Sequence, residues 1–368
     1  MHSAKQNVVF VGAFSAQEDG STGGQAYACQ SIVDGDLSLH VNWIKIDTTA
    51  DSVVHVGFLK RMFKAFLRLV KFTKAISKKK NVAAVIFTAH AFSFYEKGLM
   101  VIIASLFGKR SVLCPRSGFI VDDLKSSFKR KYFRYVFKKA SVVICQGASW
   151  KKLFEEVLPN QSSKFIVVKN WVNLAQYRGM KKVNNNKIQI LYLAWVDKQK
   201  GIFDLLAALQ KLKGLQGVEV NICGEGADFA AVKEWVSGKN MEQQIIFHGW
   251  VKGAKKYELL ANADIFVLPS YAEGLPNALL EAMIADTAVI SSHVGSVPDV
   301  ITHGKNGLMF KAGDVDELTY CLQTLIDNGE LRMRLAKEAI TTIEREHNLE
   351  QAQIQFKAVL LQPNLHAN

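Results

Sequence analysis

The stretch DIFVLPSYAEGLPNALLEAM, residues Asp264–Met283, contains a strand, a loop and a helix in sequence order. A buried strand is expected to end at the leucine of DIFVL, because the apolar run stops there and a polar loop follows. Pro276 or Asn277 then opens a helix, since proline suits the first helical position. Glu273 lies ahead of this helix and Glu281 inside it. A strand that leads through a loop into a helix is the unit of a parallel sheet covered by helices.

The same alternation extends over the whole chain. Runs such as VVIC are apolar on both faces, which a parallel sheet covered on both sides requires. The expected strands are Val8–Ala13, Leu39–Ile46, Ala83–Thr88, Ser111–Pro115, Val142–Gln146, Phe165–Val168, Ile188–Ala194, Val218–Cys223, Ile245–His248, Asp264–Leu268 and Ala288–Ser291. The expected helices include Lys60–Lys78, Tyr95–Phe107 and Lys125–Lys139, with further helices from about Asp314 to near Gln362.

The polar segment KKVNNNK, residues Lys181–Lys187, interrupts the alternation and precedes a strong new strand. A chain of 368 residues suits two domains of about 100–200 residues each. We therefore expect one domain over residues 1–182, a second over 183–345, and a C-terminal helix over 346–368 that can pack back on the first. Two successive doubly wound domains imply a cleft between the carboxyl ends of two sheets, where such folds bind ligands.

The net charge of +13 is unevenly divided. Residues 1–187 hold 30 Lys and Arg against 11 Asp and Glu, whereas residues 188–368 hold 16 against 22. The basic half is therefore expected to face an anionic surface or ligand. The five cysteines form no CxxC pair, which favours buried free thiols in a reducing compartment over a zinc site. Neither a signal peptide nor a membrane-spanning helix is predicted.

The start of the helix at Pro276 leaves backbone N–H groups without helical partners and carries the positive end of the helix dipole. These two features together form a binding site for a diphosphate. Glu273 comes before this start and Glu281 about one turn inside the helix. One carboxylate can therefore reach the sugar side of a nucleotide diphosphate while the other reaches the ribose side.

Glu273 and Glu281 stand in the E-x7-E spacing of glycosyltransferase family 4, within the family-like string EGLPNALLEAM. The segments ILYLAWVDKQKGIFDLL, NICGEGADF and IIFHGWV precede it in the family's order, and VGSVPDVITHGKNGLMF follows it. The chain resembles that family strongly over Ile188–Phe310, and more weakly in its first half through Gly23 and Gly24. The resemblance implies an α/β structure of the GT-B fold, with two Rossmann-like doubly wound domains facing across a cleft. It also implies a retaining, metal-independent transfer of a sugar from a UDP- or GDP-sugar.

By this resemblance, Glu281 hydrogen-bonds the ribose hydroxyls and Glu273 faces the hydroxyls of the donor sugar. Lys200 neutralises the diphosphate and stabilises the leaving group as charge develops there. The other donor-binding residues implied are Gly23, Gly24, Lys198, Trp250, Val251, Gly274, Leu275, Asn277 and Ala278. Each residue also has a plain structural interpretation, as a surface carboxylate, a turn glycine or a helix-start lysine. The implied mechanism is front-face displacement of the nucleotide diphosphate by an acceptor hydroxyl, in which Glu273 positions the sugar.

Two positions depart from the family's pattern. Trp195 stands where the family usually has Arg; since Trp cannot neutralise a phosphate, Lys198 is the candidate for the second positive charge. Many members carry a histidine after the strand that here ends in LCPRSGF, where this chain has Arg116. His90, in FTAHAF, is either a substitute for that histidine or a buried imidazole. The nearest DxD-like pair, Asp122–Asp123, lies in the wrong domain for donor binding, so neither a metal nor another cofactor is expected.

The segment GFLKRMFKAFLRLVKFTKAISKKK, residues Gly57–Lys80, is basic on one side. At 100° per residue, an arc of about 140° holds the basic residues, and an apolar set lies opposite. The basic arc holds Lys60, Arg61, Lys64, Arg68, Lys71, Lys74 and Lys78, and the apolar set is Leu59, Met62, Phe63, Phe66, Leu69 and Val70. Such a helix, like the second basic segment Lys125–Lys139, suits an anionic bilayer surface. The alternative is a helix that packs its apolar side on the sheet and leaves its lysines solvated.

Together, the resemblance and the charge predict a glycosyltransferase that is cytoplasmic and peripheral on the inner face of the cytoplasmic membrane. Its expected donor is a nucleotide sugar, and its expected acceptor is a lipid-linked glycan or oligosaccharide in polysaccharide or lipopolysaccharide synthesis. The alternatives are a nucleotide-sugar 2-epimerase, a phosphorylase, or an inactive GT-B subunit that recruits partners. A nucleic-acid partner is not expected, because no recognised motif accompanies the charge.

Overall fold

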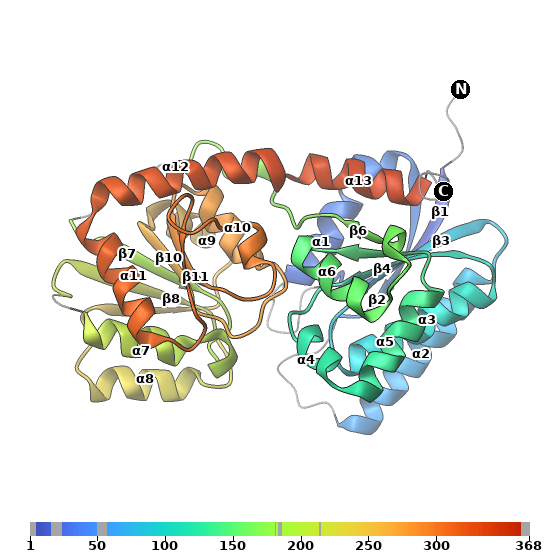
Figure 1. The fold of residues 1–368 in the computed structure, drawn as a ribbon, viewed down its shortest axis with the longest axis horizontal. Coiled ribbons are helices and arrows are strands. Elements are labelled where there is room, and N and C mark those ends of the chain that lie inside the picture. The colour runs from blue at the N-terminus through green and yellow to red at the C-terminus, as the bar shows by residue number, and fades with distance from the viewer. Residues whose placement is uncertain are drawn as a thin grey trace. The chain divides into compact units, whose positions relative to one another are not determined.

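The computed structural model describes residues 5–15, 24–49, 57–180, 182, 186–212 and 215–361. The chain divides into two compact units (Figure 1). Unit 1 comprises Met1–Asn170 with Leu349–Asn368, and unit 2 comprises Trp171–Asn348. Each unit contains a six-stranded parallel sheet with helices on both faces, so the predicted doubly wound fold class is confirmed.

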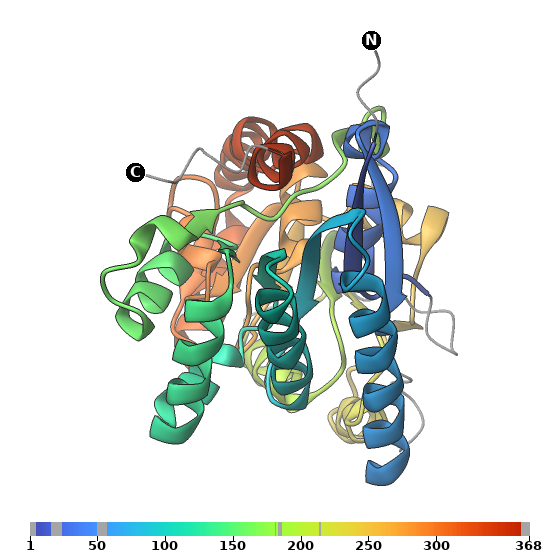
Figure 2. The same cartoon turned by 90° about the vertical axis from the view of Figure 1, so that its right-hand side faces the viewer.

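The sheet of unit 1 has the order β2-β1-β3-β4-β5-β6. Its strands are β1 (Gln6–Gly12), β2 (Val41–Asp47), β3 (Asn81–Thr88), β4 (Arg110–Pro115), β5 (Val142–Cys145) and β6 (Phe165–Val167). The helices α2 (Phe58–Ile76), α3 (Phe92–Leu106), α5 (Ser127–Lys139) and α6 (Ala148–Val157) share one apolar core with the sheet (Figure 2). The short helix α4 (Ile120–Lys125) precedes α5. On the other face lie α1 (Gly24–Val33) and α13 (Leu349–Leu361), and from α13 the Phe356 ring stacks on Phe87 at 6.4 Å.

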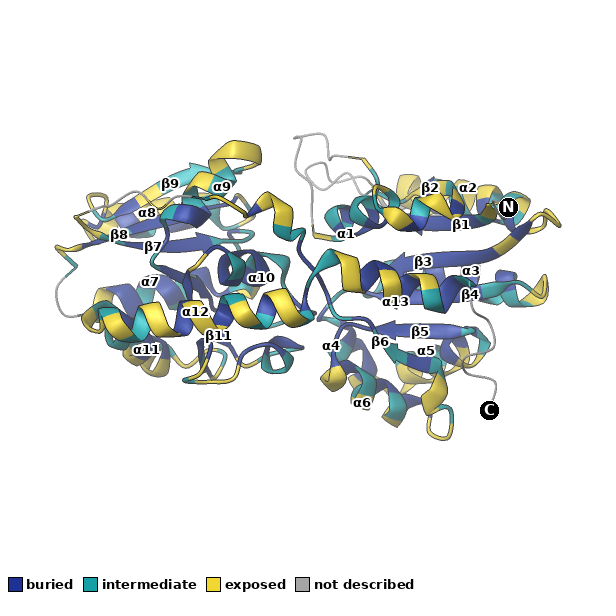
Figure 3. Ribbon diagram, turned by 90° about the horizontal axis from the view of Figure 1, so that it is seen from above, coloured by how far each residue is buried: buried dark blue, intermediate teal, exposed yellow. Residues whose placement is uncertain are grey.

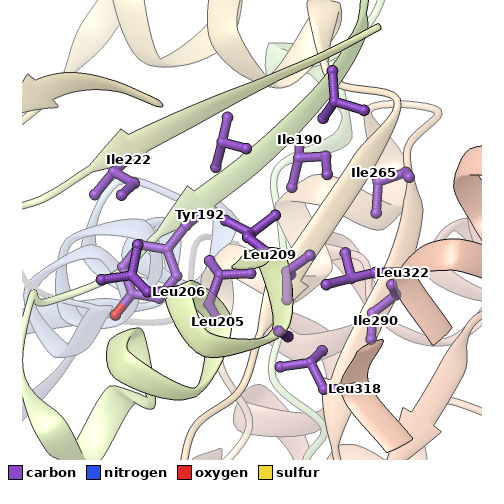
Figure 4. Packing of buried hydrophobic residues seen from close by; sticks show 14 of the residues in the cluster. Ile190, Tyr192, Leu205, Leu206, Leu209, Ile222, Ile265, Ile290, Leu318 and Leu322 are labelled. Carbon is purple, nitrogen blue, oxygen red and sulfur yellow. The ribbon is translucent and has the colours of Figure 1, made fainter. Parts of the chain in front are cut away.

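The sheet of unit 2 has the order β12-β11-β10-β7-β8-β9. Its strands are β7 (Ile188–Leu193), β8 (Val218–Cys223), β9 (Ile245–Gly249), β10 (Ile265–Leu268), β11 (Ala288–Ser292) and β12 (Leu308–Phe310). The helices α7 (Ile202–Lys211), α8 (Phe229–Gly238) and α11 (Val315–Asp327) pack on one face, where Leu206 and Leu322 belong to one apolar cluster with Ile190 (Figure 4). The other face carries α9 (Gly253–Asn262), α10 (Asn277–Ile284) and α12 (Gly329–Glu346). Figure 3 shows the inner strands buried and the helices exposed on their outer sides, whereas the edge strands β2 and β9 are only partly buried.

The chain passes from unit 1 to unit 2 between Asn170 and Trp171, earlier than the predicted boundary at residue 182. The physical reason is that Val172 already belongs to unit 2, where its N–H donates to the His347 carbonyl at 2.9 Å. Tyr177 is likewise buried in the core of unit 2. Of the segment expected to link the domains, Lys181 and residues 183–185 lie outside the described residues.

Two local features differ from the sequence expectations. The three-residue strand β12 was not predicted, because it is too short to show a period of its own. The helix expected over Lys125–Lys139 is divided into α4 and α5 at Ser126, whose ψ of 122° leaves the helical range. Helix α13, in contrast, belongs to unit 1, the domain on which the C-terminal helix was expected to pack, and there Gln353 Nε2 donates to the Ser31 carbonyl at 3.2 Å.

Replacing Leu206 by Ala should lower the unfolding free energy of unit 2 by about 2–5 kcal/mol, because its fully buried side chain leaves a cavity between α7 and the sheet. The matched control is Tyr320→Ala on α11, where the side chain is 72% exposed and the change should stay within about 0.5 kcal/mol. Urea denaturation of both variants checks this. Equal midpoints for the two variants would contradict the described core.

Candidate active site

The residues Lys200 and Glu273 meet at the carboxyl edge of the unit 2 sheet. Strands β7 and β10 are neighbours, and Lys200 follows the first while Glu273 follows the second. Because the carboxyl ends of parallel strands lie at the same edge, their loops come together there. Lys200 Nζ donates to Glu273 Oε1 at 2.6 Å, with the two side chains 22% and 10% exposed. The structure therefore joins two residues that the sequence placed 73 positions apart.

The loop after β7 holds Lys200 in place through a cap and a close backbone contact. Asp197 Oδ1 accepts a hydrogen bond from the Lys200 N–H at 2.9 Å and so caps the single turn Lys198–Lys200. Gly201 follows with a φ of +70°, and a Cβ there would lie 2.0 Å from the Pro269 carbonyl oxygen. Only glycine fits such a position, so the loop after β7 packs directly on the backbone that leads to Glu273.

A third loop, after β11, supports Glu273 from the other side. The Ser296 N–H donates to the Gly274 carbonyl at 2.8 Å. Gly295 has a φ of +56°, and a Cβ there would lie 1.9 Å from the Glu273 carbonyl oxygen. The backbone of Glu273 is thus fixed by contact with a neighbouring main chain, and Gly274 and Leu275 are buried beside it.

Glu281 lies inside α10, which begins at Asn277 as predicted, with Ala278 in its first turn. Pro276 precedes the helix with a non-helical ψ of 127°. The Glu281 side chain is 6% exposed, and Lys256 Nζ of α9 donates to its Oε1 at 2.7 Å. The contact of Lys256 with Glu281 was not predicted from the sequence. No spacing in the KGAKKYELL segment distinguishes Lys256 from a solvated helix lysine.

An aromatic pair lies beside these residues at the ends of β7 and β9. The indole rings of Trp195 and Trp250 are 5.0 Å apart at 46°. The Tyr192 hydroxyl donates to the Trp195 carbonyl at 2.7 Å. Burial raises the pKa of the Tyr192 phenol well above its usual value, and the charges of Asp197 and Glu273 add to the shift. Tyr192 therefore remains a neutral donor that fixes the backbone at Trp195.

The other predicted donor residues of unit 2 have individual environments. Val251 packs against the apolar cluster under α9 and α10. Lys198 is exposed, and its N–H donates to Asp228 Oδ2 at 2.8 Å. Lys198 therefore comes from the same capped turn as Lys200 but does not share the burial of that residue.

The predicted residues of the first half all belong to unit 1. His90 Nδ1 lies 2.9 Å from the Ser117 hydroxyl, a partly buried contact at the ends of β3 and β4. The Arg116 guanidinium donates to Asn170 Oδ1, and burial lowers its pKa to about 10, so it stays a cation at neutral pH. Gly24 begins α1, and Gly23 lies outside the described residues. Asp123, excluded as a metal ligand in the sequence, instead accepts from the Ala91 N–H at 2.8 Å.

The site of unit 2 thus pairs each of the two motif glutamates with one lysine. A buried carboxylate is costly unless a charged partner and hydrogen bonds compensate its lost hydration. Lys200 supplies that partner for Glu273 and Lys256 supplies it for Glu281. The start of α10 between them adds the positive end of a helix dipole. This arrangement can accept an anionic ligand with polar groups on both sides.

Comparison with known proteins identifies the arrangement. Residues 175–342 match the family described as glycosyl transferases group 1. This segment of the chain belongs to that family. An uncharacterized glycosyltransferase of Methanocaldococcus jannaschii is 25% identical over 269 residues, which cover 69% of this chain and 68% of the relative. The chain spans about half the length of the next curated relatives that it matches. As a member of the group, this chain is a glycosyltransferase.

Solved structures show the same GT-B fold. The Anabaena protein HepE, in complex with UDP and glucose, aligns with a TM-score of 0.74 and 16% identity, over 97% of this chain and all of HepE. The lipopolysaccharide outer core galactosyltransferase WaaB, in its apo form, aligns with a TM-score of 0.71 and 18% identity, over 97% of this chain and 99% of WaaB. These likenesses confirm the fold that the E-x7-E segment implied.

Replacing Gly295 by Ala should displace the Glu273 backbone, because a Cβ there collides with the Glu273 carbonyl oxygen. A displacement of about 1 Å should lower kcat/KM roughly 10²-fold. The control is Gly304→Ala, where φ is +75° but no atom lies within 4 Å of the new Cβ. That variant carries the same backbone strain, of about 1–2 kcal/mol, without the collision. Steady-state kinetics that fall equally in both variants would contradict the role given to this contact.

Proposed function

We propose that this enzyme transfers a sugar from a UDP-sugar to a hydroxyl of a lipid-linked acceptor, with retention of anomeric configuration and without a metal. The observation that carries the proposal is the Lys200–Glu273 contact of 2.6 Å beside the start of α10, within a group 1 glycosyltransferase. UDP is favoured over GDP as the donor base because HepE, a protein of the same fold, was solved with UDP.

The donor would lie along the start of α10. Its diphosphate would accept hydrogen bonds at the helix start, where the dipole favours negative charge. Glu281 would accept from the ribose hydroxyls and Glu273 from hydroxyls of the sugar. The Trp250–Val251 segment would lie near the uracil, with Trp195 packed behind Trp250. In this arrangement the diphosphate, the ribose and the sugar each face a group already held in place.

Lys200 would serve two partners at once. Its ammonium has three donors, of which one is engaged by Glu273, so two can turn toward phosphate oxygens. As the sugar–phosphate bond breaks, negative charge accumulates on the diphosphate, and a fixed cation there lowers the barrier. The acceptor hydroxyl then attacks from the face that the leaving group vacates, and its proton passes to an oxygen of the departing diphosphate. Glu273 orients the sugar and forms no covalent intermediate in this scheme.

Replacing Lys200 by Ala should lower kcat/KM by about 10²-fold or more, because one charge partner of the leaving group is lost. Lys211→Ala is the control, since its partner Asp316 is 85% exposed at the surface. A product assay with UDP-sugars measures both variants. Activity should survive EDTA, and strict dependence on added Mg²⁺ or Mn²⁺ would contradict the metal-free scheme. Release of an epimerised sugar without an acceptor, or a requirement for pyridoxal phosphate, would support the alternative enzymes instead.

The acceptor is assigned to a lipid on the basis of α2 in unit 1. Helix α2 turns Phe72 and Ile76 into the core, and it extends past the strand ends in Figure 2. Its first half exposes large apolar side chains: Leu59 is 82% exposed, Phe63 61% and Phe66 60%. Sheet packing therefore leaves these apolar residues of the first half uncovered, although Leu69 packs on the core, and this weakens the alternative of a merely solvated cover. We define the α2 surface as a set of exposed apolar residues and their neighbouring cations. The apolar residues are Leu59, Met62, Phe63 and Phe66, and the cations are Lys60, Arg61, Lys71 and Lys74.

The α2 surface combines the two features that bind a protein to an anionic bilayer. Exposed aromatic and aliphatic side chains enter the headgroup boundary, and each nearby cation adds about 1 kcal/mol. Arg68 is excluded from the α2 surface, because it forms an ion pair with the buried Glu96 at 2.6 Å. Within the described ranges, no helix combines the length and apolarity that a bilayer-crossing segment requires. A lipopolysaccharide galactosyltransferase among proteins of the same fold supports a lipid-linked acceptor.

Replacing Lys60, Lys71 and Lys74 by Glu should release the protein from anionic vesicles at low salt, because the electrostatic attraction reverses. The parent should retain part of its binding at 1 M salt, where screening reduces electrostatic range to about 3 Å, since apolar insertion persists there. Co-sedimentation with vesicles across a salt series measures both effects.

The control for this experiment is the same charge change in unit 2, at the exposed Lys239, Lys305 and Lys337. This variant should bind vesicles as the parent does. Equal pelleting of both triple variants, or no pelleting of the parent at low salt, would show that the α2 surface does not bind membranes.

A further inference from the structure

The ion pair between Lys256 and Glu281 joins helix α9 to helix α10. Glu281 Oε1 accepts from Lys256 Nζ at 2.7 Å, and the two side chains are 6% and 24% exposed. By contrast, the pair of the adjacent Lys255 with Glu258 is 3.0 Å long and about half exposed on both sides. Exposed pairs of that kind contribute little, whereas removing one partner of a buried pair strands the other charge. Lys256 is therefore the lysine of α9 whose loss affects a site residue.

Lys256 approaches Glu281 from a separate element. Helix α9 begins at Gly253, directly after the Trp250–Val251 segment, whereas Glu281 lies on α10. One contact thus connects the loop proposed to lie near the uracil with the carboxylate proposed to bind the ribose. The contact engages Oε1, and a carboxylate offers about four acceptor positions in all. Glu281 can therefore keep the lysine and still accept from two hydroxyls.

We propose that Lys256 is a positioning residue for ribose recognition. It acts through Glu281: by holding Oε1 it fixes the rotation of the carboxylate, so that the remaining acceptor positions face the vicinal 2′- and 3′-hydroxyls of the nucleotide. The inference rests on the proposed function, because it needs Glu281 at the ribose. The resemblance that pointed to Glu281 assigns no role to Lys256. This positioning would make the site prefer a ribonucleoside diphosphate to its 2′-deoxy counterpart.

A purely structural role for Lys256 predicts a different outcome. If the lysine only neutralised a buried charge, its loss would lower stability and weaken the binding of every nucleotide by the same factor. If it positions the carboxylate, its loss selectively removes the advantage of a nucleotide that has both hydroxyls. The ratio of the affinities for UDP and 2′-deoxy-UDP separates these roles.

The experiment is titration calorimetry of the full chain with UDP and with 2′-deoxy-UDP. The parent should prefer UDP by about tenfold or more, the usual cost of losing a hydrogen bond to a charged group. In Lys256→Met this preference should fall to within about threefold, and Lys256→Arg should restore most of it, because a guanidinium also donates to a carboxylate. The matched control, Lys255→Met, should keep the parental preference. Circular dichroism melting on each variant shows that it is folded.

Two results would overturn the proposal. Lys256→Met could bind both nucleotides as the parent does, or it could lose affinity for both by one common factor. In either case the ratio of the two affinities stays at the parental value. A Glu281→Gln variant separates these results from a failure of the proposed function. If Glu281→Gln loses the preference while Lys256→Met keeps it, Glu281 binds the ribose without help from Lys256. If Glu281→Gln also keeps the preference, the ribose assignment itself is wrong, and the role of Lys256 falls with it.

Discussion

The site of unit 2 depends on direct contact between main chains at the carboxyl edge of its sheet. The loop after β7 touches the Pro269 carbonyl through Gly201, and the loop after β11 touches the Glu273 carbonyl through Gly295. These contacts hold the loop after β10 between two others, with no side chains as spacers. A carboxylate carried by such a loop starts from a fixed backbone, so the ordering cost of binding is reduced before a ligand arrives.

Charge balance follows from that geometry. Each motif glutamate is nearly buried, and each has a lysine from a different element, Lys200 from the turn after β7 and Lys256 from α9. The two pairs leave the site close to neutral at the start of α10. A diphosphate then adds charge at a place where the helix start and the remaining donors of Lys200 can compensate it. In the proposed scheme, these groups take the place of the arginine that the family usually has where this chain has Trp195.

The architecture could be predicted from the sequence, and the two glutamates could be singled out as candidates, because both depend on patterns within short segments. Strand runs apolar on both faces indicated covered parallel sheets, and the E-x7-E spacing indicated the loop and helix that carry the two lysine-paired glutamates of the candidate site. Lys256 could not be found in this way, since its contact with Glu281 joins two helices and produces no periodic pattern in the sequence. The inward side of α2 was equally hidden, because the amphipathic pattern separates basic from apolar residues but does not say which apolar ones the sheet covers. The sequence boundary at residue 182 lies later than the division between the two units, because Val172 joins unit 2 by a backbone contact that composition does not record.

The central claim is that a nucleoside diphosphate binds where the loops after β7 and β10 meet. Hydrogen exchange measured by mass spectrometry, with and without saturating UDP, tests it most directly. Bound UDP should slow exchange in peptides that cover residues 269–281 and 195–201, because ligand contacts at the start of α10 suppress local opening. Unchanged exchange in both regions, under conditions in which calorimetry shows UDP to be bound, would contradict the account.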